Sequence, residues 1–550
     1  MKFRIVCLSP ALVVLGLLFL SSCKVQKTRA DLLVFNAKIY MVDSSFNTVE
    51  AMLIQDGKIL ATGSKDSLQK QYEIADSLDA GGKFIYPGFI DAHAHFEGYG
   101  NSLQRVNLVD TKSWDEVLTR TQSFAGENPE GWLQGRGWDQ NDWEVKQFPT
   151  NEQLSEMFPD RPVILTRIDG HAAIANKKAL ELAGVHAGDT LTGGEVVVKN
   201  GELTGLLIDN AVDLVTLKIP APDRKQLQAA LKAAEENCFA MGLTTVDDCG
   251  LSYESVDIIR GLHDSGQLRM RLYVMLSDQP RNYDYLQKTG IINTGRLHVR
   301  GFKLYGDGAL GSRGACLLQP YADQAGHYGF LLSNPSHFDS VAAWMIKTDF
   351  QMCTHAIGDS GNRTLLNIYG KYLKGKNDRR WRIEHAQVVN QNDFKLFGTY
   401  SIIPSVQPTH ATSDMYWAGD RLGKEREKGA YAYKQLLSEN GWIPLGTDFP
   451  VEDISTFKTF FAAVARKDSK NWPEQGYQKE NALSREEALR GMTIWAARSN
   501  FEENVKGSLE KGKFADFVIL DRDLMSIPES EILQTQVLYT FLNGEKVYSR

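Results

Sequence analysis

The stretch Pro87-Gly88-Phe89-Ile90-Asp91-Ala92-His93-Ala94-His95 decides the fold of this chain. An apolar lead-in that ends in His-Ala-His has the pattern of a buried strand. Residues two apart on a strand face the same side, so we expect His93 and His95 to point together into the interior. Two imidazoles on one face at a strand end suit a divalent metal ion, which makes this stretch the first candidate for a metal site.

Seven further segments have the pattern of short buried strands, and helical stretches such as Arg224–Met241 and Ser484–Ala497 lie between several of them. Strands that alternate with helices favour a parallel sheet, and eight of them predict an α/β fold of the (β/α)8 TIM type over residues 87–500. The eight predicted strands are Phe89–His95, Leu243–Asp248, Arg271–Leu276, Val299–Tyr305, Gln351–His355, Arg382–His385, Ser401–Gln407 and Ile443–Asp448.

Both ends of the chain are rich in short strands. Asp56-Gly57 and Asn543-Gly544 each lie between apolar runs, which is a hairpin signal. We therefore expect residues 31–86 and 501–550 to combine into one composite β-sandwich domain beside the barrel.

A long insertion, at about residues 96–241, separates the first predicted barrel strand from the second. We expect it to roof the mouth of the barrel and to shape substrate access. Its tryptophans have two possible roles, an apolar substrate pocket or packing within a core. They are Trp114, Trp132, Trp138 and Trp143.

The first residues have the pattern of an export signal. Lys2 and Arg4 precede an apolar run, and the small residues before Cys23 resemble a bacterial lipobox. We expect residues 1–22 to be a lipoprotein signal peptide and residues 23–30 to be a tether that begins at a lipidated Cys23. A plain signal peptide that is cut nearby is the alternative.

The predicted location is the cell envelope, with the membrane as a partner through the lipid on Cys23. Lys24 follows that cysteine in place of an aspartate, which favours the outer membrane if the source is Gram-negative. A net charge of −7 over 550 residues gives no basic footprint, so we expect no nucleic-acid partner. Four further cysteines show no metal or disulfide spacing and are expected to be mainly packing residues: Cys238, Cys249, Cys316 and Cys353. The sequence does not set the oligomeric state.

Polar residues with metal or proton chemistry lie at the ends of several later predicted strands. They are Lys303, His355, His385 and Asp448. Active sites of such barrels gather at the carboxyl ends of the strands, so these side chains are expected to converge with His93 and His95. Any one of them alone would be read as a core residue or a helix cap. Their convergence is what predicts a metal site.

In these motifs the chain resembles the amidohydrolase superfamily, and within it the third amidohydrolase family, the branch typified by N-substituted formamide deformylases. The matching segments run through almost the whole chain in order. They are Pro87–His95, Asp169-Gly170-His171 with Asn176, Phe302–Arg313, His355–Asp359, Arg382–Gln387, Gln407–His410, Gly446–Pro450 and Gly507–Asp516.

The resemblance implies a ligand set for two divalent ions, usually zinc. It implies that His93 and His95 bind one ion and that His355 and His385 bind the other. Lys303 resembles a lysine that is carboxylated by CO₂ and bridges the two ions; the alternative is an ordinary lysine paired with Asp307 or another carboxylate, with a single metal.

The same resemblance implies the roles of the remaining site residues. Asp448 resembles a catalytic aspartate that contacts the metal, orients the attacking water and acts as general base and then acid. His171 and His410 are candidate donors to the oxyanion and to the substrate. His171 has a structural role in the insertion as its alternative. Arg313 is a candidate substrate-binding residue, or else a brace for its loop.

The expected function is hydrolysis of a non-peptide C–N bond in a small-molecule amide, such as an N-acyl or N-formyl amine. Two alternatives stay open. One is a hydrolase of cyclic amides, ureas or amidines, because the superfamily spans these substrates. The other is a non-catalytic binding lipoprotein of the envelope that kept the barrel, since a fold does not fix a function.

Overall fold

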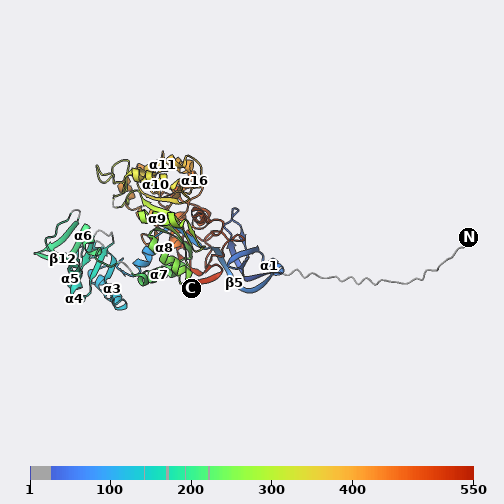
Figure 1. Ribbon diagram of the computed structural model, residues 1–550, viewed down its shortest axis with the longest axis horizontal. Coiled ribbons are helices and arrows are strands. Elements are labelled where there is room, and N and C mark those ends of the chain that lie inside the picture. Colours follow the sequence, from blue (N-terminus) through green and yellow to red (C-terminus); the bar gives the residue numbers. More distant parts are fainter. Residues whose placement is uncertain (2–26, 141–142, 169–171, 192–193, 221–222, 312) are drawn as a thin grey trace.

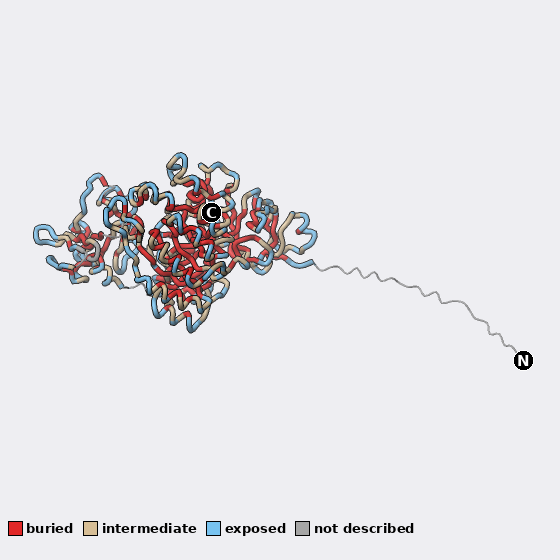
Figure 2. The backbone as a smooth tube through the Cα atoms, turned by 90° about the horizontal axis from the view of Figure 1, so that it is seen from above, coloured by how far each residue is buried: buried red, intermediate tan, exposed pale blue. Residues whose placement is uncertain are grey.

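The computed structural model describes residue 1 and residues 27–550, apart from 141–142, 169–171, 192–193, 221–222 and 312. Three parts lie in a row in Figure 1: a lobe built from the insertion, a central barrel and a sheet that contains the first strands of the chain. Buried residues concentrate in the central part (Figure 2). The barrel therefore holds the main core of the molecule.

Seven parallel strands form the wall of the barrel, and a short strand, β15 (Ile292–Asn293), pairs with one of them in the antiparallel sense. These strands are almost wholly buried, which explains their apolar runs, because both faces of a parallel sheet are covered. In spatial order they are β6 (Phe89–Ala94), β13 (Leu243–Leu251), β14 (Arg271–Ser277), β16 (Leu297–Tyr305), β17 (Gln351–Ala356), β18 (Arg382–His385) and β19 (Ile403–Ser405).

Helices surround this wall. Helix α7 (Arg224–Ala240) starts with a capping box, in which Asp223 and Gln226 satisfy each other's backbone N–H groups. The principal helices are α7 (Arg224–Ala240), α8 (Tyr253–Asp264), α9 (Pro280–Thr289), α10 (Pro335–Met345), α11 (Asp359–Leu373), α12 (Phe394–Tyr400), α16 (Tyr433–Asn440), α17 (Thr456–Ala465), α18 (Arg485–Gly491) and α19 (Ile494–Ser499). Short helices such as α2 (Phe96–Ser102) and α13 (Pro408–Asp414) follow β6 and β19.

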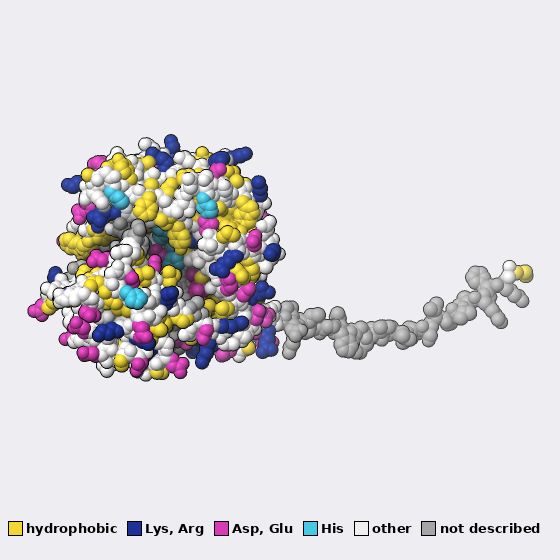
Figure 3. Space-filling model, turned by 60° about the vertical axis from the view of Figure 1, so that its left-hand side comes forward, with side chains coloured by type: hydrophobic (Ala, Val, Ile, Leu, Met, Phe, Trp, Pro, Cys, Tyr) yellow, Lys and Arg dark blue, Asp and Glu magenta, His cyan; other side chains and the backbone are white. Residues whose placement is uncertain are grey.

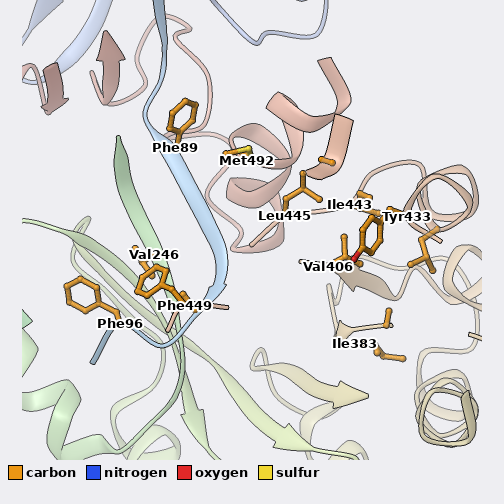
Figure 4. Packing of buried hydrophobic residues seen from close by; sticks show 14 of the residues in the cluster. Phe89, Phe96, Val246, Ile383, Val406, Tyr433, Ile443, Leu445, Phe449 and Met492 are labelled. Atoms are coloured by element: carbon orange, nitrogen blue, oxygen red, sulfur yellow. The ribbon is translucent and has the colours of Figure 1, made fainter. Parts of the chain in front are cut away.

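The predicted eighth strand, Ile443–Asp448, fills the gap between β19 and β6 but is not a regular strand. Gly446 donates a backbone hydrogen bond to Val406, and Ala92 donates one to Leu445. Ile443 and Leu445 pack into the large apolar cluster around the barrel (Figure 4). Pro444 has no backbone N–H to donate, so the segment pairs through an isolated bridge between Val406 and Leu445, and its last residue, Asp448, has a φ of 65°. The barrel is closed by seven strands and this irregular segment.

Both ends of the chain share one sheet, as predicted. Its strands run in the order β22-β21-β20-β5-β1-β3-β4, with β2 paired to β1. The Asp56-Gly57 and Asn543-Gly544 turns connect β3 to β4 and β21 to β22. The strands are β1 (Thr28–Tyr40), β2 (Thr48–Val49), β3 (Ala51–Gln55), β4 (Lys58–Gly63), β5 (Tyr72–Pro87), β20 (Phe517–Leu520), β21 (Val537–Leu542) and β22 (Glu545–Ser549), and α1 (Lys65–Gln71) lies between β4 and β5.

The insertion forms a lobe with its own six-stranded sheet, in the order β11-β12-β10-β9-β8-β7. It lies to one side of the barrel, opposite the composite sheet (Figure 1). Its elements are β7 (Val106–Asn107), α3 (Trp114–Glu127), β8 (Leu133–Trp138), α4 (Glu152–Met157), β9 (Val163–Arg167), β10 (Ala172–Ala175), α5 (Lys177–Ala183), β11 (Gly194–Lys199), β12 (Glu202–Asp209) and α6 (Asn210–Thr216).

The four tryptophans of the insertion pack within the lobe itself. Trp138 and Trp143 are buried in one of its apolar clusters, and Trp114 and Trp132 pack against its clusters. Of the two roles considered for these tryptophans, the structure shows packing within a core. No described residue of residues 103–220 lines the cavity at the barrel mouth, and the roof that we expected the lobe to form stays a prediction.

The predicted lipidation site, Cys23, lies outside the described residues. Over the described part of the chain, no helix combines the length and apolar character needed to cross a bilayer. The four later cysteines are unpaired, and three of them are buried, as expected for packing residues: Cys238, Cys249 and Cys353 are buried and Cys316 is partly exposed.

Candidate active site

The ends of four barrel strands place polar side chains around one point. His93 follows Ala92 near the end of β6, and Lys303, His355 and His385 lie toward the ends of β16, β17 and β18. The His93 and His385 rings have centroids 4.7 Å apart, and those of His355 and His385 are 4.6 Å apart. Parallel strands thus bring together residues that lie almost 300 positions apart in the sequence.

Asp448 completes this cluster from the segment that closes the barrel. Its backbone N–H donates to the carbonyl of His93 at 2.7 Å. Its Oδ1 lies 3.2 Å from His95 Nε2, and its Oδ2 lies 3.5 Å from His410 Nε2. The structure therefore gathers six of the predicted residues, together with Lys303, at the mouth of the barrel.

The donor set fits a divalent cation. One ligand atom each from His93, His385 and Asp448 lies within 4.8 Å of the others. Asp448 Oδ1, His355 Nε2 and His410 Nε2 are buried and have no hydrogen-bond partner among the described residues. Buried polar atoms are normally paired, so these atoms are available to a ligand. Imidazole and carboxylate are the ligands that zinc and similar ions accept.

Two of these residues reach the cluster through unusual backbone conformations. His385 has a φ of 73° and Asp448 a φ of 65°, both in the left-handed region. In a regular strand, neighbours such as Glu384 and His385 would face opposite sides. The positive φ turns the chain at His385, so both side chains contact the cluster. Left-handed conformations of this kind cost energy and are concentrated at functional sites.

Two histidines of the cluster, His93 on β6 and His385 on β18, are each oriented through one ring nitrogen. His93 Nδ1 lies 2.6 Å from Glu384 Oε2, and His385 Nδ1 lies 2.7 Å from Gln407 Oε1. These contacts fix the Nδ1–H tautomer and direct Nε2 toward the metal position. Sequence reasoning did not assign a role to Glu384. The sequence did contain a signal for Glu384, because Arg382 and Glu384 lie two residues apart and therefore share the inner face of β18.

His95 is held differently. Its Nδ1 lies 3.0 Å from the backbone carbonyl of Cys249, and its side chain is 27% exposed, whereas that of His93 is fully buried. The carbonyl again leaves Nε2 free, now toward Asp448. His95 is thus the more accessible member of the His-x-His pair.

Lys303 is buried, and its Nζ lies 3.1 Å from His93 Nε2. Burial alone would lower the pKa of Lys303, but neighbouring groups that include Glu384 and Asp448 raise it overall. The ordinary pairing with Asp307 that we considered is not formed in the structure. Asp307 instead accepts backbone hydrogen bonds from Cys316, Ile357 and Gly358.

Burial and neighbouring charges set the protonation of the cluster. Burial, together with Lys303, lowers the pKa of His93 and brings that of His355 to about 3, so both imidazoles are neutral and can act as ligands. Burial alone would raise the pKa of Asp448, but His93 and contacts with His410 and His95 hold it well below its usual range. Burial alone would lower the pKa of His410, yet Asp448 and Glu452 raise it to about 9.

Two predicted site residues are not placed at this cluster. His171 lies outside the described residues. Arg313 donates from Nε and Nη2 to the Asp323 carboxylate at 3.1 and 2.8 Å and does not line the cavity among the described residues. The geometry around Arg313 matches the brace alternative, and its substrate-binding role stays a prediction.

A cavity of about 370 Å³ opens above the cluster. In Figure 3, histidine side chains are visible in the hollow beside the lobe. The cavity combines the polar groups of the cluster with mainly apolar walls. The wall residues are Tyr305, Leu310, Ile357, Trp417 and Val451. A small molecule with an apolar body can therefore reach Asp448 and the histidines.

The profile of the amidohydrolase family matches residues 76–548 of this chain. The chain belongs to the amidohydrolase family. That family membership, the histidine–aspartate cluster and the parallel barrel agree with one another. The chain is accordingly a metal-dependent hydrolase of the amidohydrolase superfamily.

Curated relatives of this amidohydrolase align over nearly its full length. It is 34% identical to the Protein LONG AFTER FAR-RED 3 of Arabidopsis thaliana (94% of this chain, 92% of the relative). It is 30% identical to the putative amidohydrolase YtcJ of Bacillus subtilis (93% and 98%). It is 24% identical to the N-substituted formamide deformylase of Arthrobacter pascens (94% and 98%).

Among solved structures, an uncharacterized metal-dependent hydrolase from Pyrococcus horikoshii has a TM-score of 0.78 and 27% identity, covering 90% of this chain and 99% of that one. The sequence resemblance to the third amidohydrolase family is thus confirmed.

Proposed function

We propose that this amidohydrolase cleaves the C–N bond of a small acyclic amide, an N-acyl or N-formyl amine. The observation that carries the proposal is the unpartnered Oδ1 of Asp448, which lies beside the histidine cluster at the base of an apolar-walled cavity. The resemblance to an N-substituted formamide deformylase at 24% identity supports the amide class.

A divalent cation held by His93, His95, His355, His385 and Asp448 would supply a Lewis acid and would lower the pKa of water to roughly 7. We propose zinc, and two ions if Lys303 is carboxylated. The Asp448 carboxylate accepts the proton of the attacking water and returns it to the leaving nitrogen as the C–N bond breaks. The ionised state of Asp448 at neutral pH suits the first of these two steps.

His410 has the position and charge to stabilise the carbonyl oxygen as it becomes negative. With a pKa raised to about 9, its imidazole is protonated at neutral pH and donates from Nε2. A donor aimed at developing charge is among the largest contributions to catalysis. The apolar walls of the cavity exclude bulk water from this step. We propose the same kind of contact for His171.

The first experiment measures metal content together with turnover on the purified polypeptide without residues 1–23. We expect about two equivalents of zinc and hydrolysis of N-formyl or N-acyl amines, with Lys303→Ala reducing the metal to about one equivalent. Turnover only on cyclic amides, ureas or amidines would move the substrate class to that alternative. A protein that takes up no metal would contradict the hydrolytic mechanism and favour a binding lipoprotein.

We also propose that Cys23 is lipidated and holds the enzyme on the cell envelope. If the source is Gram-negative, the proposed location is the outer membrane. The support is the sequence around Cys23 alone: a basic start, an apolar run and small residues before the cysteine. Labelling with a palmitate analogue tests it. We expect label on the wild-type protein and none on Cys23→Ser, which is released from the membrane fraction.

A further inference from the structure

Two carboxylates that the proposed mechanism does not use, those of Asp414 and Glu452, also line the cavity. His410 and Asp414 lie four residues apart on α13, which places them on one face of that helix, one turn from each other. Glu452 lies four residues after Asp448, in the loop beyond the barrel-closing segment. Each carboxylate thus follows a residue of the catalytic cluster by about one helical turn of sequence, and both face the same cavity.

The partners of these carboxylates are neutral. Asp414 Oδ2 accepts hydrogen bonds from the Tyr431 hydroxyl at 2.8 Å and from Gln387 Nε2 at 3.3 Å. Glu452 Oε1 accepts one from the Ser413 hydroxyl at 2.5 Å. Among the described residues, no lysine or arginine forms an ion pair with either carboxylate. The nearby His410 opposes their negative charge, and Lys458 and Lys467 border a neighbouring pocket that Glu452 also lines. Neither lysine forms an ion pair with Glu452, so both carboxylates stay available to a cation in the cavity.

The remaining walls provide no group that would hold an anion there. No arginine lines the described part of the cavity, and Lys303 is buried against His93. Trp417, Leu310 and Val451 supply apolar surface near the carboxylates. The indole face of Trp417 adds a surface on which a cation is attracted by the ring quadrupole.

A separate observation shows that this cavity takes a ligand. Asp448 lines it with a side chain that is only 7% exposed, and its Oδ1 has no hydrogen-bond partner among the described residues. That atom marks where the reacting end of a ligand lies. Asp414 and Glu452 line the same cavity as Asp448, so one molecule can contact all three.

We propose that the substrate carries a cationic group, such as a primary ammonium, at the end remote from the scissile carbonyl, and that Asp414 and Glu452 select it. The inference rests on the proposed amide hydrolysis and names the substrate class for the same site. An ammonium gains from both carboxylates and from Trp417, whereas a carboxylate at that position is repelled. N-acylated or N-formylated diamines fit this description, and N-acyl amino acids do not.

The test uses three amides of matched length, which end in an ammonium, a methyl group or a carboxylate, with the zinc-loaded full chain. We expect kcat/KM to be about tenfold higher for the ammonium than for the methyl compound and lowest for the carboxylate. Glu452→Gln and Asp414→Asn each shrink the ammonium-to-methyl ratio toward one. A loss of rate that acts through His410 would lower all three substrates together, so the ratio isolates selection.

Glu425→Gln is the matched control, because it removes the same charge from an exposed glutamate that pairs with Lys428 outside the cavity. We expect it to keep the wild-type ratio.

Calorimetry with the corresponding free amines (a diamine, an alkylamine and an amino acid) repeats the comparison without turnover. If no amide is cleaved but the diamine binds tightest and Glu452→Gln removes that order, the amide proposal fails and the charge selection stands. If amides are cleaved and neither rates nor binding favour the cation, the selection is overturned while the amide proposal stands. If both readouts lack the order and no amide is cleaved, both proposals are overturned.

Discussion

Two groups of buried polar side chains share the barrel interior, one at the mouth and one deeper inside. At the mouth, Asp448 Oδ1, His355 Nε2 and His410 Nε2 have no hydrogen-bond partner among the described residues. In the deeper group, Asp247 accepts from Arg382 Nη1 at 2.9 Å and from Asn500 Nδ2 at 2.5 Å. Arg382 also donates to the carbonyl of Ala92 at 3.1 Å.

We infer from this difference that the group at the mouth serves function and the deeper group serves stability. The deeper groups repay most of their loss of water by bonding to one another, although Arg382 Nε has no partner among the described residues. They connect β6, β13, β18 and the segment after α19. The atoms at the mouth lack that repayment among the described residues, and a ligand can supply it. Changes at the mouth should therefore affect activity, whereas changes in the deeper group should affect folding.

The largest effect is expected from Asp448→Asn at the mouth. The amide keeps the shape but cannot accept the proton, so kcat should fall by about 10²–10⁴-fold. The melting temperature should change little, because His410, whose pKa the carboxylate raises, can lose its proton once the carboxylate is gone, so no unpaired charge stays buried. A steady-state assay and a thermal melt test this, and a strong drop in melting temperature would contradict the comparison.

The next largest effect is expected from Asp247→Ala in the deeper group. It removes the nearer of two carboxylates that face the buried Arg382 guanidinium, at 2.9 Å against 3.8 Å for Glu384, which should lower the free energy of unfolding by about 3–5 kcal/mol. Denaturant unfolding measures this change. The control is Asp349→Ala, whose aspartate side chain is 84% exposed, and it should stay within about 0.5 kcal/mol of the wild type. Equal losses in the two variants would refute a structural role for the deeper group.

The third largest effect is expected from Glu384→Gln, a change at a residue that contacts both groups, through His93 and Arg382. The amide oxygen still accepts the Nδ1–H of His93 but no longer carries the charge that makes the ring a better ligand. We expect zinc affinity to fall about 10–100-fold, as measured by competition with a chelator. Gln407→Glu, which adds a charge beside His385, is the converse variant and should strengthen binding. An unchanged affinity in Glu384→Gln would leave that residue with only a packing role.

The smallest effect is expected from Arg313→Ala, outside both groups. Its Asp323 partner also contacts Arg421, and the pair is partly exposed, so the stability should change by about 1 kcal/mol or less. If Arg313 is only a brace, kcat/KM on the preferred amide should stay within about threefold of the wild type. A drop of more than tenfold would restore the substrate-binding role that its sequence motif suggested.

Much of the fold followed from local patterns in the sequence. The seven regular barrel strands are apolar runs between helical stretches, and both Asp-Gly and Asn-Gly turns lie where a two-residue hairpin requires positive φ. His93, His355 and His385 could be predicted because each ends such a run. These features depend on neighbouring residues, which a sequence displays directly.

The rest depends on contacts between distant residues. The left-handed conformations at His385 and Asp448 arise from how β18 and the closing segment meet β6, and no residue type near them signals it. For Glu384, the sequence marks a polar position on one face of β18, but the contact with His93 arises only when β18 and β6 share the barrel. The position of the lobe beside the barrel is likewise set by packing between whole elements, and its expected role as a roof stays a prediction.

The composite sheet has a consequence for how the chain is made. Strand β5 ends at Pro87, and its neighbour β20 begins at Phe517. At synthesis rates of about 5–20 residues per second, the edge of β5 waits about 20–90 s for that partner. An exposed strand edge is a template for pairing with other chains. During synthesis, the nascent chain is therefore exposed to aggregation for about a minute at the edge of β5, in the sheet that later joins both ends of the chain.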